Sequence, residues 1–88
     1  MSNLPTVTNL SPKGGSVSGG ETVTVTGTNF TDANVVKFGS VKGNRLVVNS
    51  DSSITIVAPA QSAATVDVTV TDDAGTSVLN GSDRYTYA

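Results

Sequence analysis

The chain has 88 residues and a net charge of −2, and charged residues make up only 14% of it. A chain of this length forms one domain with a thin core and little room for a deep cleft. It contains no histidine, no cysteine and no basic run, which argues against acid–base and thiol catalysis, a disulfide framework and nucleic-acid binding. No stretch reaches the roughly 18 apolar residues of a membrane span, so membrane insertion is not expected.

Apolar and polar residues alternate throughout the chain and nowhere recur at helical spacing, which predicts an all-β protein. In chain order the predicted strands are Thr6–Leu10, a short edge segment at Ser16–Ser18, Thr22–Thr26, Val35–Phe38, Arg45–Asn49, Ser53–Ala58, Thr65–Thr71, Thr76–Leu79 and Arg84–Tyr87. Glycine, proline, asparagine and aspartate predict turns between them, at Ser11–Gly15, Gly43-Asn44 and Asp72–Gly75.

The stretch Thr22–Thr26, TVTVT, is the clearest strand, because it places Val23 and Val25 on one face and threonines on the other. Alternation of this kind gives each sheet one apolar and one wet face. About seven short strands, spaced by about 8 to 12 residues, predict a sandwich of two antiparallel sheets. The paired cysteines and core tryptophan of antibody domains are missing, so the sandwich is expected to be immunoglobulin-like only in its architecture.

Six segments, in order along nearly the whole chain, resemble the IPT/TIG domain family. They are PTVTNLSPKGGSVSGG (Pro5–Gly20), TVTVTGTNF (Thr22–Phe30), VKFG (Val36–Gly39), SSITIVAPA (Ser52–Ala60), TVDVTVTDDAGTS (Thr65–Ser77) and YTY (Tyr85–Tyr87). The resemblance implies an early-set immunoglobulin-like β-sandwich without a catalytic role. We therefore expect a single domain over residues 5–88. Residues 1–4 are expected to be either a remnant added for protein expression or a linker.

The resemblance says more about the fold of the chain than about its binding partners. Family members occur in plexins and other surface receptors and adhesins, beside catalytic domains in starch-degrading glycosidases, in phage structural proteins and in transcription factors. The transcription-factor branch contacts DNA through basic loops, and this chain has none.

The residues offer little for catalysis or for a cofactor. Asp72 and Asp73 are adjacent carboxylates, but neighbours on a strand point to opposite faces and cannot flank one bond. We expect both, with Gly75, to form a hairpin turn. No catalytic or cofactor-binding residue is predicted.

A metal site has one candidate, the loop that contains Asn29, Asp32 and Asn34. Their oxygen atoms suit calcium in principle, but one carboxylate supplies little charge. Asparagine and aspartate also cap turns by bonding to the nearby backbone, and this structural role is the one expected here. No metal ligand is predicted, and a weak calcium site at this loop is left open.

The only aromatic residues are Phe30, Phe38, Tyr85 and Tyr87, and all four fall at positions expected in the core. Exposed aromatic rings for stacking on sugars are therefore not expected. The basic residues Lys37, Lys42 and Arg45 cluster in sequence, and Lys37 is expected to pair with Asp67 across neighbouring strands, on a solvated face. N-glycosylation sequons begin at Asn9, Asn29 and Asn80. Their number is no greater than chance gives in a chain so rich in serine and threonine.

These observations favour a non-catalytic structural or spacer module of a larger extracellular, cell-envelope or virion protein. Its partners would be the flanking domains, with a surface protein or a glycan as further candidates, and the isolated domain is expected to be a monomer. Two alternatives stay open: a recognition module that binds a glycan or surface protein through loops or a sheet edge, and an accessory domain of a secreted glycosidase. They differ in what flanks the domain and in what it binds.

Overall fold

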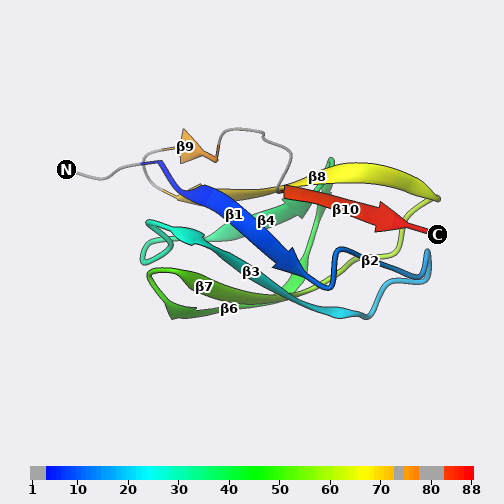
Figure 1. Ribbon diagram of the computed structural model, residues 1–88, viewed down its shortest axis with the longest axis horizontal. Helices are drawn as coiled ribbons and strands as arrows, with labels where there is room; N and C mark the ends of the chain where they lie inside the picture. The colour runs from blue at the N-terminus through cyan, green and yellow to red at the C-terminus, as the bar shows by residue number, and fades with distance from the viewer. Residues whose placement is uncertain (1–3, 73–74, 78–82) are drawn as a thin grey trace.

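The computed structural model describes residues 4–72, 75–77 and 83–88, and it forms a sandwich of two β-sheets (Figure 1). The first sheet has the order β1 (Thr6–Ser11), β3 (Thr22–Thr28), β7 (Ser53–Val57) and β6 (Asn44–Ser50). The second sheet has the order β2 (Gly14–Gly15), β10 (Arg84–Tyr87), β8 (Ala64–Asp72), β4 (Val35–Phe38) and β5 (Val41–Lys42), with β9 (Gly75–Thr76) beside β8. The predicted all-β, immunoglobulin-like sandwich is confirmed. Within the described ranges no helix is long and apolar enough to span a membrane.

The core lies between the two sheets and is built by the alternation that the sequence shows. Val23 and Val25 of β3 are fully buried, and so are Val68 and Val70 of β8 on the opposite sheet. The largest buried side chains are Phe30, Phe38, Tyr85, Tyr87, Leu10, Ile54 and Ile56. Burial of apolar surface is the main favourable term in folding, so these side chains account for most of the stability of the sandwich.

Phe30 reaches the core through a sharp corner at the end of β3. Asn29 adopts the left-handed region with φ 63°, a conformation that asparagine tolerates better than most residues. Gly27 is needed for a different reason, because a Cβ there would lie 2.6 Å from the Phe30 ring and would collide with the Thr6 carbonyl oxygen. The corner thus depends on one asparagine for its turn and one glycine for the close approach of β1.

Two short strands were not expected from the sequence. Gly14–Gly15, assigned to a turn, forms β2 beside β10, whereas Ser16–Ser18 is not a strand. Val41–Lys42 forms β5 against β4. A strand of two residues is too short to show an alternating pattern in the sequence. Each of these strands is defined only by its pairing with a neighbouring strand.

The predicted turn at Gly43-Asn44 is wrong: the turn lies at Gly39 and Ser40, and Asn44 begins β6. Gly39 has φ +68°, the conformation that favours glycine. At Gly43 the chain crosses from the second sheet to the first, so close to the core that a Cβ would lie 2.6 Å from Ile56. Of the predicted strand Thr76–Leu79, the structure describes only Thr76 and Ser77, and Thr76 belongs to β9.

Every sheet edge within the described part of the chain is short or irregular. At the edges of the first sheet, β1 has a register shift between Val7 and Asn9, and β6 has two shifts. At the edges of the second sheet, β2, β5 and β9 have two residues each. Irregular and short edges discourage pairing with another chain, because they present few aligned backbone groups.

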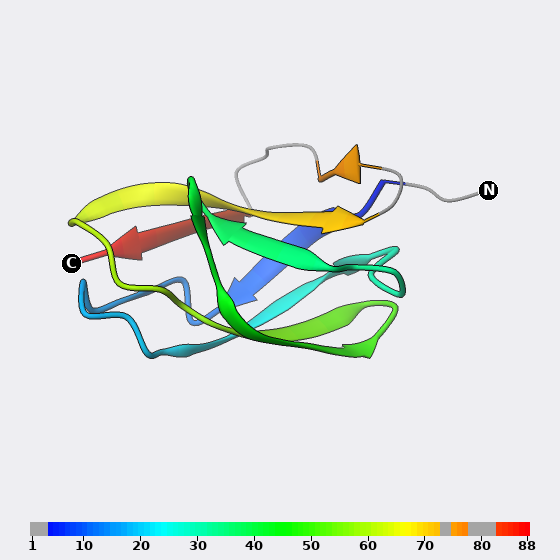
Figure 2. The same cartoon turned by 180° about the vertical axis from the view of Figure 1, so that it is seen from behind.

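The chain enters and leaves the sandwich at opposite ends. β1 begins at one pole of the long axis, whereas β10 ends at the other, and the reverse view shows the same separation (Figures 1 and 2). The molecule measures 39 × 22 × 18 Å along its principal axes. The described ends of the domain, at β1 and β10, therefore lie at opposite poles.

Replacing Phe30 with alanine should lower the free energy of unfolding by about 3 to 5 kcal/mol, because the ring is fully buried and leaves a cavity. Urea denaturation measures this directly. Val47→Ala is the matched control, since Val47 is 51% exposed and its truncation should change stability by less than about 0.5 kcal/mol. A loss below about 1 kcal/mol for Phe30→Ala would show that the corner does not anchor the core.

Candidate functional site

The loop between β3 and β4, the candidate for a metal site, is hydrogen-bonded to the rest of the protein through Asn29 and Asn34. The Asn29 side-chain amide donates to the Leu4 carbonyl oxygen at 3.3 Å, and the Asn34 backbone N–H donates to the Thr71 carbonyl oxygen at 2.9 Å. Asp32 is exposed. Among the described residues there is no group of three or more His, Cys, Asp or Glu side chains that could hold a metal ion. The hydrogen bonds account for the loop as a structural element.

Asp51 closes this loop, although nothing in the local sequence marks it. Its Oδ1 accepts a 2.6 Å hydrogen bond from the Thr31 hydroxyl and a 3.3 Å bond from the Thr31 backbone N–H, while its carbonyl oxygen accepts from Phe30 N–H. The hydroxyl bond is the main reason that the pKa of Asp51 lies below its ordinary value, with the backbone N–H groups of Thr31 and Asn29 adding to it against the effect of desolvation. This carboxylate therefore acts as a loop cap.

The two tyrosines of β10 are the largest polar side chains in the core. Tyr85 packs edge-on against Phe38, with ring centroids 5.1 Å apart, and against Tyr87 at 5.0 Å. The Tyr87 hydroxyl donates to the Pro59 carbonyl oxygen at 2.7 Å. Among the described residues none bonds to the Tyr85 hydroxyl, which is buried against Gly15. Both tyrosines are thus buried on β10, but among the described residues only the Tyr87 hydroxyl has a hydrogen-bond partner.

Burial raises the pKa of both tyrosines above the ordinary value, because it penalises the phenolate. For Tyr85, repulsion from the Tyr87 phenolate, at a pH where that group ionises, and from the Glu21 carboxylate also raises the pKa. For Tyr87, a hydrogen bond with Gln61 lowers the pKa against the effect of burial. Both groups are therefore neutral at physiological pH. All four aromatic rings of the chain are at most 1% exposed, as predicted, and none can stack on a sugar.

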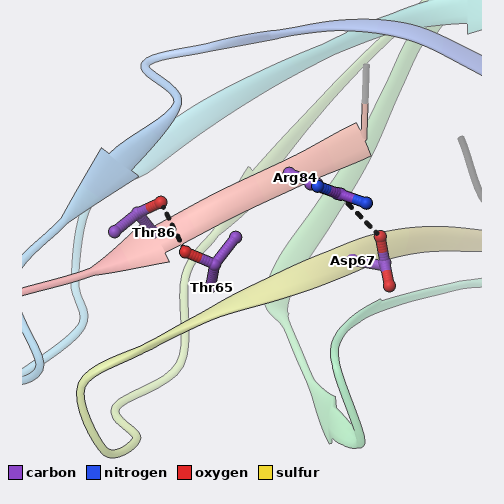
Figure 3. Close-up of polar contacts among 4 residues, drawn as sticks. All are labelled: Thr65, Asp67, Arg84 and Thr86. Carbon is purple, nitrogen blue, oxygen red and sulfur yellow. Dashed lines mark hydrogen bonds and ion pairs between the residues drawn. The ribbon is translucent and has the colours of Figure 1, made fainter. Parts of the chain in front are cut away.

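Polar side chains lie on the outer face of the second sheet, and Figure 3 shows four of them on β8 and β10. The hydroxyls of Thr65 and Thr86 lie 3.0 Å apart in a hydrogen bond between β8 and β10, and Arg84 Nε lies 4.0 Å from Asp67 Oδ1. With side chains 67% and 38% exposed, an ion pair of this kind contributes under about 1 kcal/mol.

The expected pairing of Lys37 with Asp67 is wrong in its register. The strands that carry them, β4 and β8, are neighbours as expected, but Lys37 lies opposite Thr69 on β8 and opposite Lys42 on β5. Asp67 lies opposite Arg84 instead. Sequence alternation gave the correct face for each residue, but register depends on strand contacts that no local pattern encodes.

Asp72 is buried, and its Oδ1 accepts a 3.2 Å hydrogen bond from Gly75 N–H, which is the turn role expected for it. Asp73 lies outside the described residues. Of the sequons, Asn9 is exposed on β1, the Asn29 amide is engaged with Leu4, and Asn80 lies outside the described residues.

Comparison with known proteins agrees with this architecture. A family model for the IPT/TIG domain matches residues 5–87. Protein SPT23 of Saccharomyces cerevisiae is 30% identical over 84 residues, which are 94% of this chain and 8% of that protein.

Two solved structures show the same fold. The gamma-CGTase of alkalophilic Bacillus clarkii matches with a TM-score of 0.80 at 22% identity, over 97% of this chain and 12% of that one. The extracellular region of Plexin A4 matches with a TM-score of 0.78 at 28% identity, over 98% of this chain and 9% of that one. The chain therefore spans 8% to 12% of the length of these three proteins.

The two phenols generate a paired prediction. Tyr87→Phe should destabilise the protein by about 1 to 3 kcal/mol, because it removes a donor from the buried Pro59 carbonyl. Tyr85→Phe should be neutral or stabilising, since it removes a buried hydroxyl for which the described residues offer no partner. Thermal melting of the two variants checks this, and equal losses would show that both hydroxyls are satisfied alike.

Proposed function

Because this chain belongs to the IPT/TIG domain family, a family of non-catalytic immunoglobulin-like modules, we propose that it works as a structural spacer within a larger extracellular, cell-envelope or virion protein. Its partners are the domains that flank it. The observation that carries the proposal is the placement of the chain ends, with β1 beginning at one pole and β10 ending at the other (Figure 1). A bead connected in this way adds length between its neighbours.

The path of the chain at each pole supports a connection of fixed geometry. Before β1, the Leu4 carbonyl oxygen is bonded by the Asn29 side chain. After β10, the Ala88 N–H donates to the Gly15 carbonyl oxygen at 3.0 Å. Both connections to the sandwich are therefore held by hydrogen bonds, which limits how the flanking segments can swing.

The surface of the domain fits a structural spacer better than a module that recognises a glycan or surface protein. The aromatic rings are buried, and the outer face of the second sheet carries mainly threonines and small charged clusters. The sheet edges are short or irregular, which makes strand addition by a partner unfavourable. In the alternative role, as an accessory domain beside a catalytic domain, the module would likewise hold its neighbour in position.

Small-angle X-ray scattering on one, two and three tandem copies, joined without added linkers, tests the spacer. Each copy should lengthen the particle by a constant step larger than 22 Å, the second dimension of the domain. Steps that shrink or vary with copy number would contradict it. Binding of the single domain on a glycan array would support the recognition alternative instead.

A further inference from the structure

Two lysines lie side by side on the outer face of the second sheet, at the edge formed by β5. Lys37 of β4 lies directly opposite Lys42 of β5, and both are exposed. The neighbours of Lys37 along β4, Val36 and Phe38, are buried in the core, so the Lys37 side chain points outward. Because opposed residues of an antiparallel pair share a face, both ammonium groups extend into solvent from the same side of the sheet.

No acidic residue lies opposite this lysine pair in the described strands. On its other side, Lys37 lies opposite Thr69 of β8. The Asp67 carboxylate, two residues along β8, lies opposite Arg84 instead, with Nε 4.0 Å from Oδ1 (Figure 3). Like charges directly opposite each other destabilise a sheet. The lysine pair thus carries a repulsion that a bound anion would relieve.

This face is basic although the chain is acidic. The outward-facing charges of β4, β5, β8 and β10 are those of Lys37, Lys42 and Arg84 against the carboxylate of Asp67, a net charge of +2, whereas the whole chain carries −2. Asp72, at the end of β8, is buried. Complementary potentials steer and select partners. The face therefore attracts an anionic partner, whereas the rest of the chain, with its excess of carboxylates, repels one.

The chemistry of the face fits carboxylates on a peptide better than a nucleic acid or a charged glycan. All four aromatic rings are at most 1% exposed, so none can stack on a base or a sugar ring. Closely spaced phosphates or sulfates would also meet the Asp67 carboxylate and the net charge of −2. In an extended peptide, acidic residues two positions apart place their carboxylates about 7 Å apart on one side, which two long lysine side chains can reach.

We propose that the outer face of the second sheet, centred on Lys37 and Lys42, docks an acidic peptide segment. The docking is a function beyond spacing. A spacer uses the two poles of the long axis, whereas the strands of this face run along the side of the sandwich (Figures 1 and 2). The face stays accessible when neighbouring domains are joined at the poles, and it needs neither an exposed ring nor a free sheet edge.

Nuclear magnetic resonance titration of the full 88-residue domain with a short oligoglutamate peptide tests the docking. The amide signals of β4 and β5 and that of Thr69 should shift, and a glycine–serine peptide of the same length should leave them unchanged. The affinity should fall as salt is raised from about 0.05 to about 0.5 M, because exposed charges are screened.

Two matched charge reversals separate this face from the charge of the whole chain. Lys42→Glu turns the like-charge pair into an opposite-charge pair, so it should weaken peptide binding about tenfold or more while the melting temperature stays the same or rises. Lys13→Glu makes the same change at an exposed position next to β2, on the other edge of the sheet, and should weaken binding by no more than about twofold.

Absence of shifts on this face at millimolar peptide, or equal weakening by Lys42→Glu and Lys13→Glu, would overturn the proposal. Tighter binding of single-stranded DNA or of a heparin fragment at the same residues would also overturn it, because the face would then select phosphate or sulfate over carboxylate. Each of these outcomes leaves the spacer role to the scattering experiment, which does not depend on this face.

Discussion

The packing of Tyr85 and Tyr87 beneath the second sheet determines where the chain can leave the domain. These rings and Phe38 meet edge-to-face, and the Tyr87 hydroxyl is tied to Pro59. With its inner face buried in this way, β10 lies between β8 and β2 and runs to the pole opposite the start of β1. The position of the ends, the parallel pairing with β2 and the polar outer face all depend on this strand being held in place.

The fold could be predicted because it follows from a local feature of the sequence, the alternation of apolar and polar residues. Alternating valine and threonine in β3 specifies a strand with one buried face, and the same pattern in β8 supplies the facing sheet. Two features that the sequence did not reveal are set by contacts distant in sequence. The pairing of Gly14–Gly15 with β10 depends on residues some seventy positions away, and Asp51 caps a loop twenty residues earlier. Neither leaves a mark in its own neighbourhood.

The candidate site shows the same division. Sequence reasoning correctly placed the aromatic rings in the core and Asp72 in a turn, since burial and turn chemistry follow from residue type. It misjudged the partner of Asp67, because register is a property of two strands together. The proposed spacer role rests mainly on the backbone, on the direction and placement of the strands, and composition reveals little of it. The chain spans 8% of SPT23, 12% of a gamma-CGTase and 9% of a plexin, and a fold shared by proteins so different does not by itself specify a function.

The proposed spacer role requires the domain to hold its two ends at a fixed separation along its long axis. Spin labels at Leu4→Cys and Ala88→Cys, measured by pulsed electron resonance, test this most directly because the chain has no other cysteine. We expect one narrow distance distribution centred above 22 Å, the second dimension of the domain. A broad distribution, or one centred below that value, would contradict it.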